Sequence, residues 1–371
     1  MRGPAVRPIV IAAGGTGGHF FPAEALASEL LSRGHRVVLM TDARSGAMTS
    51  SVFAGLDRFV LSGAGIAGRG AVRGVRAIGA LSSGVLQARR IFTTLSASVV
   101  VGFGGYPSVA PVVGAWLVRR RPAIVLHEQN AVLGRANRFL AGRADRLVLS
   151  FAATERVGAG MPTVVLGNPV RPAIAALAGS GYVLPGDVIE LLVLGGSLGA
   201  RVFSDVVPSA VTALPAEIRA RLHVVQQCRA EDLDRVRAIY DNAGITAELA
   251  AFFPDVARRL QAAHLVIARA GASTVTELAV AGRPSILVPL PGAIDDHQTA
   301  NARALSMAGG ALVMPQPGFT PETLRVRLSE VLCDSQTLAR AAAAARDVAA
   351  PAASARLADL VEELTRQEVR S

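Results

Sequence analysis

Short apolar segments alternate with longer amphipathic segments along the whole chain. Apolar, β-branched runs separated by stretches of helical spacing predict parallel strands that helices cover on both faces. The pattern therefore indicates an α/β fold. The predicted strands are Pro8–Ala12, Val37–Met40, Ser98–Val101, Ala123–Leu126, Arg146–Leu149, Ile189–Leu194, His223–Val225, Leu265–Ala268 and Ser285–Val288.

The alternation breaks between Asn168-Pro169 and Pro185-Gly186, in a stretch rich in Pro, Gly and Ala. The two halves begin alike, each with an apolar strand, a glycine-rich turn and a helix (Val10–Gly18 and Leu192–Gly199). We predict two Rossmann-like, doubly wound parallel-sheet domains, 1–170 and 171–350. They face each other across a cleft, with ligands at the carboxyl ends of the strands. The last helical segment, 351–371, is expected to pack back on the first domain.

Composition limits the classes of protein that fit. The 371 residues are 51% hydrophobic, which supplies enough apolar surface for real cores and excludes a disordered chain. Aromatic residues are only 4%, too few for a protein that grips single strands by stacking. The two cysteines, Cys228 and Cys333, cannot build a disulfide framework or a zinc ribbon. All 38 basic residues are Arg, which excludes a Schiff-base or P-loop lysine.

The basic charge is concentrated in one half. Residues 1–170 contain 19 Arg against 7 acids, whereas residues 171–371 contain 19 Arg against 21 acids. Nine Arg and no acid fall between Arg58 and Arg121. A GC-rich genome explains Arg in place of Lys, but not the scarcity of acids in one half. The asymmetry predicts an acidic partner: nucleic acid, an anionic membrane surface or an acidic substrate.

The pattern does not predict a targeting or membrane-spanning segment. The apolar run Ile9–Ala13 is too short for the core of a signal peptide. The uncharged stretch Ala97–Val118 has the length of a membrane span, but its middle, Gly102–Ser108, has the residues of a turn. We interpret it as strand, loop and helix, and expect a cytoplasmic protein.

The first glycine loop, Gly14–Gly18, lies between a strand and a helix predicted to begin near Pro22. Glycines let a backbone approach a phosphate, and the helix N-terminus adds free N–H groups. Phe20 stands where a dinucleotide fingerprint has its third glycine, so NAD is disfavoured. Asp42 is either a ribose ligand or a turn residue. His19 is a base, a phosphate ligand or a helix-entry residue.

Two further motifs of the first half follow predicted strands, Gly102–Ser108 and His127-Glu-Gln-Asn130. Four consecutive polar groups at a strand end are costly to bury without a task. Their spacing is not that of a HExxH metal site. His127 is either catalytic or part of a hydrogen-bonded loop clamp. At the domain junction, Arg171 of Leu166–Arg171 can give two donors to a phosphate.

The second half offers a second glycine turn, Gly195–Arg201, in which the Ser197 hydroxyl adds to the phosphate cradle. In Arg269–Glu277 a helix is predicted to begin near Ser273. Glu277 binds a ribose diol or complements the helix dipole. Pro291–Gln298 with Asn301 suits sugar hydroxyls. The D-x-D pair Asp232 and Asp234 is predicted on a solvated helix face, and Asp295-Asp296 makes no metal site by itself.

Together, the motifs GGTGGHFFPA, GFGGYPS, HEQN, GNPVR, GGSLGAR, RAGASTVTE and DHQTANA, in this order, resemble those of the MurG family of bacterial peptidoglycan glycosyltransferases. The resemblance covers nearly the whole chain. It implies the two-domain GT-B fold. It also implies inverting transfer of N-acetylglucosamine from UDP-N-acetylglucosamine to the C4 hydroxyl of undecaprenyl-pyrophosphoryl-N-acetylmuramyl-pentapeptide. No metal or cofactor is implied, because UDP-N-acetylglucosamine is a substrate.

The resemblance also implies roles for individual residues. His19 is the first candidate base and Glu128 the second. Phe253 falls where the family often has Ile against uracil, and His297 where some members have a second Gln. The implied donor contacts are Thr16, Gly17, Gly18, Asn130, Arg171, Ser197, Phe253, Ala272, Ser273, Thr274, Val275, Thr276, Glu277 and Gln298.

The basic segment Arg69–Phe92 mixes Arg with apolar residues and is interpreted as an interfacial amphipathic element, or as an ordinary surface helix. The resemblance implies a peripheral place on the cytoplasmic face of the inner membrane, with an anionic surface and no nucleic acid as partner. The family also suggests other cell-wall synthesis proteins as partners. The candidate acceptor and membrane contacts are Tyr106, Arg73, Arg76, Arg89 and Arg90.

Three other functions compete. One is another nucleotide-sugar enzyme, such as a UDP-N-acetylglucosamine 2-epimerase or a natural-product glycosyltransferase, which HEQN, GGYPS and the basic half disfavour. An NAD-dependent oxidoreductase is disfavoured by Phe20 and by two glycine turns in separate domains. A silent membrane or nucleic-acid binder leaves Arg171, Glu277 and Gln298 unexplained.

Overall fold

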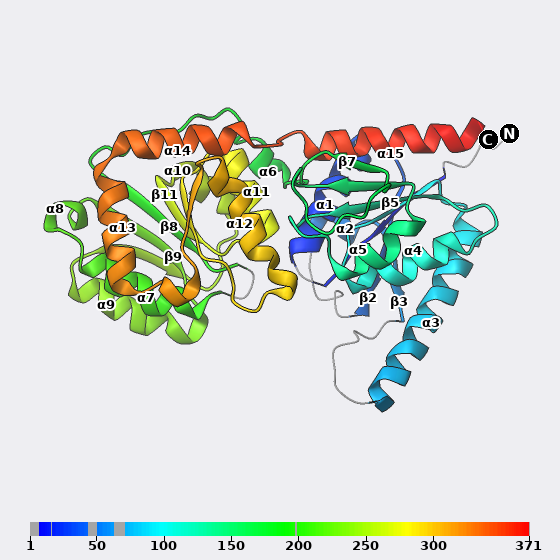
Figure 1. The fold of residues 1–371 in the computed structure, drawn as a ribbon, viewed down its shortest axis with the longest axis horizontal. Coiled ribbons are helices and arrows are strands. Elements are labelled where there is room, and N and C mark those ends of the chain that lie inside the picture. Colours follow the sequence, from blue (N-terminus) through cyan, green and yellow to red (C-terminus); the bar gives the residue numbers. More distant parts are fainter. Residues whose placement is uncertain (1–6, 16, 44–49, 63–70, 197–198, 371) are drawn as a thin grey trace. The chain divides into compact units, whose positions relative to one another are not determined.

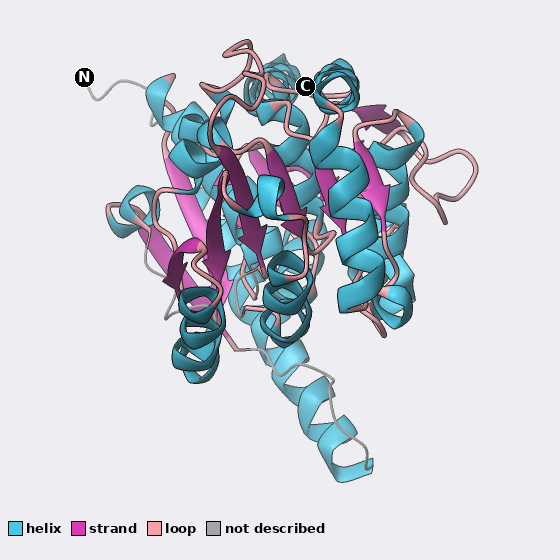
Figure 2. Cartoon of the chain, turned by 90° about the vertical axis from the view of Figure 1, so that its left-hand side faces the viewer, coloured by secondary structure: helices cyan, strands magenta, loops and turns pink. Residues whose placement is uncertain are grey.

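The computed structural model describes residues 7–15, 17–43, 50–62, 71–196 and 199–370. The chain forms two compact units, Met1–Arg171 with Ala352–Ser371, and Pro172–Pro351. Each unit is a parallel β-sheet with helices on its faces (Figures 1 and 2). The α/β class and the two Rossmann-like sheets predicted from the sequence are confirmed. The junction lies one residue from the boundary expected at residue 170.

The sheet of the first unit has the order β3-β2-β1-β4-β5-β6-β7 within the described ranges, and all its strand pairs are parallel. Its strands are β1 (Ile9–Ala12), β2 (Val37–Asp42), β3 (Asp57–Leu61), β4 (Val99–Gly102), β5 (Ala123–Glu128), β6 (Arg146–Leu149) and β7 (Thr163–Val165). Its helices are α1 (Gly17–Ser32), α2 (Ser51–Ala54), α3 (Ala71–Leu95), α4 (Val109–Trp116), α5 (Arg135–Leu140) and α15 (Ala353–Arg370), with short 3₁₀ turns at Tyr106–Ser108 and Ala141–Arg143.

Strand alternation gives the first sheet two apolar faces. Ile9 and Ile11 of β1 belong to a buried cluster that includes residues of α1 and α15. Val10 and Ala12 of the same strand belong to a second buried cluster, with residues of α3 and α4. Successive side chains of a strand point to opposite faces, so β1 is apolar throughout because both faces are covered.

The C-terminal helix α15 returns to the first unit and packs on α1. Leu357 and Val361 are fully buried in the shared core. At the rim, Arg33 contacts the Asp359 carboxylate at 2.6 Å and the Glu362 carboxylate at 3.4 Å. The first unit is thus completed by the last residues of the chain, as the sequence suggested.

The second sheet has the order β10-β9-β8-β11-β12-β13, again parallel. Its strands are β8 (Ile189–Leu194), β9 (Leu222–Gln227), β10 (Thr246–Ala250), β11 (Leu265–Ala268), β12 (Ser285–Leu287) and β13 (Ala311–Val313). Its helices are α6 (Pro172–Ala175), α7 (Arg201–Thr212), α8 (Ala216–Arg219), α9 (Leu233–Asn242), α10 (Val256–Ala262), α11 (Ala272–Ala281), α12 (His297–Met307), α13 (Pro321–Cys333) and α14 (Ser335–Asp347).

Four strands were not predicted: β3, β7, β10 and β13. Each is an edge strand of its sheet. Their side chains are mostly exposed or only partly buried, unlike those of central strands such as β1 and β2. The apolar pattern predicts strands that are buried on both faces, and so it passes over the edges.

Two local predictions were wrong. The first glycine loop leads into α1 at Gly17, and Pro22 lies inside that helix rather than at its start. Asp232 is not on a solvated face, because it is 5% exposed and accepts a hydrogen bond from Arg235 at 2.7 Å, whereas Asp234 is exposed. Arg235 lowers the pKa of Asp232, which keeps the buried carboxyl ionised.

The basic helix α3 extends past the edge of the first sheet in both views (Figures 1 and 2). Its C-terminal part is anchored, since Ala88 and Phe92 are buried against the core. None of the helices in the described part of the chain combines the length and the apolar character that a bilayer crossing requires.

Candidate functional site

Three motifs of the first unit meet at the carboxyl end of its sheet. β1, β4 and β5 are neighbours that pair in parallel register, so the loops after them leave the sheet at one edge. The Ser108 hydroxyl oxygen lies 2.9 Å from the carbonyl oxygen of Ala12 and 2.8 Å from that of Gly104, so its one proton is shared between two acceptors. His19 Nδ1 lies 2.8 Å from Gln129 Oε1. The glycine loop, the GFGGYPS turn and the HEQN segment therefore form one surface.

His19 lies in the first turn of α1 and is half-buried. Its ring passes close to Gly105, where a Cβ atom would lie 3.2 Å from both Cδ2 and Nε2 of His19. Gly105 also has φ +65°, which glycine adopts without strain. A residue without a side chain thus lies beside the Nε2 edge of His19. Tyr106 follows directly and is half-buried.

His127 and Gln129 are completely or almost completely buried. Gln129 Nε2 lies 3.0 Å from His127 Nδ1 and 3.1 Å from the carbonyl of His127. His127 Nε2 lies 3.1 Å from the carbonyl of Gly167. Burial is the main cause that lowers the pKa of His127 to about 4. A neutral His127 with a hydrogen bond at each ring nitrogen fits the hydrogen-bonded loop clamp, one of the two roles that the sequence left open.

Glu128 is buried and its carboxylate accepts hydrogen bonds from four donors. Oε1 accepts from the backbone N–H and the side-chain amide of Asn130, at 3.0 and 3.1 Å. Oε2 accepts from the backbone N–H of Gly134 and the amide of Asn137, both at 2.9 Å. A carboxylate with four donors holds the loop 128–137 in place, and those bonds would have to break before it could take a proton.

Other predicted residues of the first unit lie around this surface. Gly17 and Gly18 begin α1, and Gly18 is exposed. The Arg171 guanidinium lies 5.1 Å from the centre of the Phe21 ring on α1. Asn168 is 1% exposed, and neither polar atom of its amide has a partner within the described ranges. Buried amides are normally satisfied, so Asn168 is an exception among the buried polar residues of this unit.

In the second unit, the turn after β8 is held by a side chain that the sequence did not single out. Gln227, at the end of β9, accepts from the backbone N–H of Gly195 at 3.0 Å and donates to the carbonyls of Gly196 and Ala251. A Cβ at Gly195 would lie 2.3 Å from the Ala200 nitrogen, so this turn requires glycine. The sequence signal that could have revealed Gln227 is a polar residue at the end of a buried strand.

The segment Ala272–Glu277 forms the first turns of α11, close to the predicted start. Ser273, Thr274 and Glu277 are partly exposed and lie on one helix face, whereas Ala272, Val275 and Thr276 are buried. Thr276 donates to the carbonyl of Ala272 and is thereby satisfied. The Ser273 hydroxyl has no partner among described residues. This N-terminus, preceded by Gly271, offers free N–H groups to an anion or a hydroxyl.

Amides and one arginine position the loops around this helix. Asn301 is buried and donates to the carbonyl of Ala270 at 3.1 Å. Gln298, on α12, accepts from the backbone N–H of Leu290 at 2.9 Å. Arg269 donates to the carbonyls of Val288 and Pro289, and to Gln316. The predicted sugar-binding loop is thus tied to the end of β12.

The side chain of Phe253 is buried and covered by an arginine. Its ring is 4% exposed and the Arg259 guanidinium lies 4.0 Å from the ring centre. The neighbouring Phe252 is 66% exposed. Only the backbone of Phe253 can therefore meet a base, because Arg259 and the core cover its side chain.

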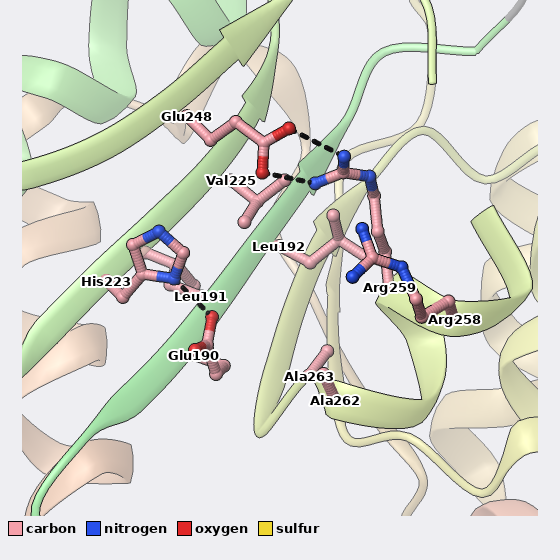
Figure 3. Close-up of a pocket in the computed structure, with 10 residues that line it drawn as sticks. All are labelled: Glu190, Leu191, Leu192, His223, Val225, Glu248, Arg258, Arg259, Ala262 and Ala263. Atoms are coloured by element: carbon pink, nitrogen blue, oxygen red, sulfur yellow. Dashed lines mark hydrogen bonds and ion pairs between the residues drawn. The ribbon is translucent and has the colours of Figure 1, made fainter. Parts of the chain in front are cut away.

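Arg259 also lines the pocket drawn in Figure 3, between α10 and one face of β8, β9 and β10. It pairs with both oxygens of Glu248, and the adjacent His223 pairs with Glu190 at 2.7 Å. Hydrogen bonds from Arg258 and, as the second cause, from Arg259 lower the pKa of Asp255 to about 2. The charges of this pocket neutralise one another, so it stiffens the 252–255 loop rather than presenting a charged site.

Some predicted residues cannot be placed. Thr16 and Ser197 lie outside the described residues. Arg73 and Arg76 belong to α3, but their side chains also lie outside the described part. Arg89 and Arg90 are exposed on the same helix. Where the chain is described, no cluster of three or more His, Cys, Asp or Glu side chains is arranged to hold a metal ion.

Comparison with known proteins assigns the family. The model of the glycosyltransferase family 28 N-terminal domain matches residues 9–149, and that of the C-terminal domain matches residues 190–364. The chain belongs to glycosyltransferase family 28. Its GT-B fold and its resemblance to MurG are confirmed by the matches below, which makes the protein a hexosyltransferase.

A relative in Granulibacter bethesdensis is named UDP-N-acetylglucosamine–N-acetylmuramyl-(pentapeptide) pyrophosphoryl-undecaprenol N-acetylglucosamine transferase. It is 62% identical over 364 residues, which cover 98% of this chain and 95% of the relative. The crystal structure of Acinetobacter baumannii MurG matches with a TM-score of 0.78 at 30% identity, covering 96% and 99% of the two chains. The calicheamicin glycosyltransferase CalG4, at 17% identity and a TM-score of 0.67, covers 97% and 98% and shares the fold.

The buried His127 makes a pH prediction for this family 28 enzyme. Its folded pKa, about 4, lies below the unfolded value of about 6.5, so between these pH values only the unfolded chain binds the proton. Stability is therefore lost as pH falls through this window. When the pH is lowered from 7 to 5, the unfolding free energy of the wild type should fall. That of His127→Gln should fall by roughly 2 kcal/mol less, because the variant lacks this histidine.

Urea unfolding followed by tryptophan fluorescence measures this loss, since Trp116 is the chain's only tryptophan and lies in the first unit. His297→Gln, in the second unit, is the matched control and should follow the wild type. An equal loss in His127→Gln and wild type would contradict the neutral, buried state of His127.

Glu128→Gln should act on donor binding more than on the chemical step. An amide in place of the carboxylate turns one acceptor into a donor that faces the N–H groups now bonded to Glu128, which displaces Asn130. We expect the donor KM to rise at least about tenfold with a smaller change in kcat. Steady-state kinetics with the sugar donor measures both, and a loss confined to kcat would instead support Glu128 as the base.

Proposed function

We propose that the protein transfers N-acetylglucosamine from UDP-N-acetylglucosamine to the C4 hydroxyl of undecaprenyl-pyrophosphoryl-N-acetylmuramyl-pentapeptide. One observation carries the proposal: the three loops at the ends of β1, β4 and β5 converge around His19. The printed name of the relative that is 62% identical supports the same substrates.

In this proposal the second unit binds the nucleotide sugar. The N-termini of α7 and α11 present N–H groups and a positive dipole end to the diphosphate. Ser273 adds a hydroxyl, and Glu277 on the exposed face of α11 accepts the ribose diol. Arg171 carries guanidinium donors of the kind that bind and stabilise a diphosphate.

The chemical step is an in-line displacement with inversion. The acceptor C4 oxygen forms a bond to the anomeric carbon while the bond from that carbon to the diphosphate oxygen breaks. The bonding electrons leave with UDP, and the hydroxyl proton passes to Nε2 of His19 as general base. Positive dipoles and guanidinium donors stabilise the charge that develops on UDP, which is the task a metal performs in other transferases. We therefore propose a reaction without metal or cofactor.

Transfer of labelled N-acetylglucosamine to a short-chain lipid-linked muramyl-pentapeptide, with EDTA present, tests the proposal. Labelled disaccharide product is expected. Product that forms only after excess magnesium is added would overturn the metal-independent step. UDP release or 2-epimer formation without disaccharide would overturn the acceptor assignment and favour another nucleotide-sugar enzyme.

We further propose that the first unit docks on the cytoplasmic face of an anionic membrane, where the lipid acceptor is anchored. On α3, Ile78 is 64% exposed and Leu86 is also exposed, beside Arg89 and Arg90. α3 packs on α4, which ends at the exposed Trp116. Arg residues with exposed apolar and aromatic side chains suit a bilayer interface.

A charge reversal on α3 separates membrane binding from donor binding. Each basic residue near an anionic surface contributes roughly 1 kcal/mol, so Arg89→Glu with Arg90→Glu should weaken binding to phosphatidylglycerol-containing vesicles at least about tenfold. Cosedimentation measures vesicle binding, and a UDP-induced rise in melting temperature measures donor binding, which should not change. Arg340→Glu, exposed in the second unit, is the control. An equal loss of vesicle binding and of UDP binding would contradict a membrane role.

A further inference from the structure

We propose that Gln129 is a positioning residue that holds His19 in the form with a proton on Nδ1 and a free electron pair on Nε2. The inference rests on the proposed function, because it explains how His19 is made ready to accept the acceptor proton. It is carried by a chain of hydrogen bonds that runs from a backbone carbonyl to the His19 ring.

The first step is the orientation of the Gln129 amide. Its Nε2 lies 3.1 Å from the backbone carbonyl of His127. A carbonyl oxygen can only accept a hydrogen bond, so the atom facing it must be the amide nitrogen. The amide oxygen of Gln129 then points the other way, toward His19.

The second step fixes His127 independently. Its Nε2 lies 3.1 Å from the carbonyl of Gly167, so Nε2 must carry the proton. A neutral imidazole with a proton on Nε2 has an acceptor at Nδ1, and this atom receives the second N–H of the Gln129 amide at 3.0 Å. Two backbone carbonyls thus give the same orientation of Gln129. Burial keeps His127 neutral, since its pKa is lowered to about 4.

The third step is the consequence for His19. Gln129 Oε1 lies 2.8 Å from His19 Nδ1 and can only accept, so His19 Nδ1 carries a proton. Neutral His19 therefore has its electron pair on Nε2, the atom beside Gly105. In water a neutral histidine interconverts between its two tautomers, whereas here only one is bonded.

The remaining buried charge of the motif does not compete for this role. Glu128, next in sequence to His127, is saturated by four donors on the loop that follows it. Gln129 is 1% exposed, so solvent cannot replace its bond to His19 at low cost. The amide is a buried, preorganised support for an atom at the surface of the site.

Gln129→Met tests the proposal, because Met fills a similar volume and cannot bond His19. We expect kcat for sugar transfer to fall about 10- to 100-fold while the donor KM stays within about twofold. A UDP-induced rise in melting temperature shows that the variant is folded and binds donor. Gln367→Met, an exposed residue of α15, is the matched control and should keep wild-type kinetics.

Two readouts separate positioning from general support of the fold. Nitrogen-15 spectra of the six labelled histidines, with His19 assigned by His19→Gln, should show the Nδ1–H tautomer in the wild type and a mixture in Gln129→Met. In addition, His19→Ala with Gln129→Met should be no slower than His19→Ala alone, since Gln129 acts through His19.

A wild-type His19 protonated on Nε2 would overturn the proposal, as would multiplicative losses in the double variant. An unchanged kcat in Gln129→Met, with an active wild type, would overturn it and leave the proposed function standing. A wild-type protein that makes no disaccharide would instead overturn the proposed function.

Discussion

Parallel pairing of β1, β4 and β5 is the constraint on which the first unit's site depends. Since the three strands run the same way in register, the residues that follow them leave the sheet at one edge, and this brings together His19 and Gln129, which are 110 positions apart in sequence. The second sheet repeats the arrangement with β8, β9 and β11. Central strands need helices on both faces, and α15 is recruited from the end of the chain to cover part of the first sheet. Packing of the apolar faces thus sets where the polar loops converge.

Each sheet has a buried glutamine at that edge. Gln129 joins the HEQN segment to His19, and Gln227 joins the glycine turn after β8 to the loop after β10. A buried amide is most stable when its donors and acceptor are all bonded, so each of these two glutamines favours one geometry of the loops that it joins. Glycine at 105 and 195 then allows the backbone to approach the His19 ring and the Ala200 nitrogen closely. Loops held in this way can present ligand-binding groups without first being ordered by the ligand.

The sequence predicted the central strands, the glycine turns and the start of α11, because apolar runs and glycine-rich turns are local signals. It did not predict β3, β7, β10 and β13, whose half-exposed side chains lack a continuous apolar run. Long-range pairing explains the other differences. Burial of Asp232 depends on Arg235, which compensates its charge, and the cover over Phe253 comes from Arg259. The motif HEQN marked a site, but the division of labour within it follows from contacts with Gly167, Asn137 and His19, which no spacing reveals.

Those contacts distinguish two acid–base groups that the sequence left as alternatives. A general base needs an electron pair that no other hydrogen bond uses, on a group that its neighbours hold in position. Glu128 has its carboxylate turned into the loop it organises, where four N–H groups already use its electron pairs. His19 has the opposite arrangement: its Nδ1 is anchored through Gln129 to a buried, neutral His127, and its Nε2 lies beside a glycine. The carboxylate thus shapes the loop that carries Asn130, and the proton exchange that we propose falls to the imidazole.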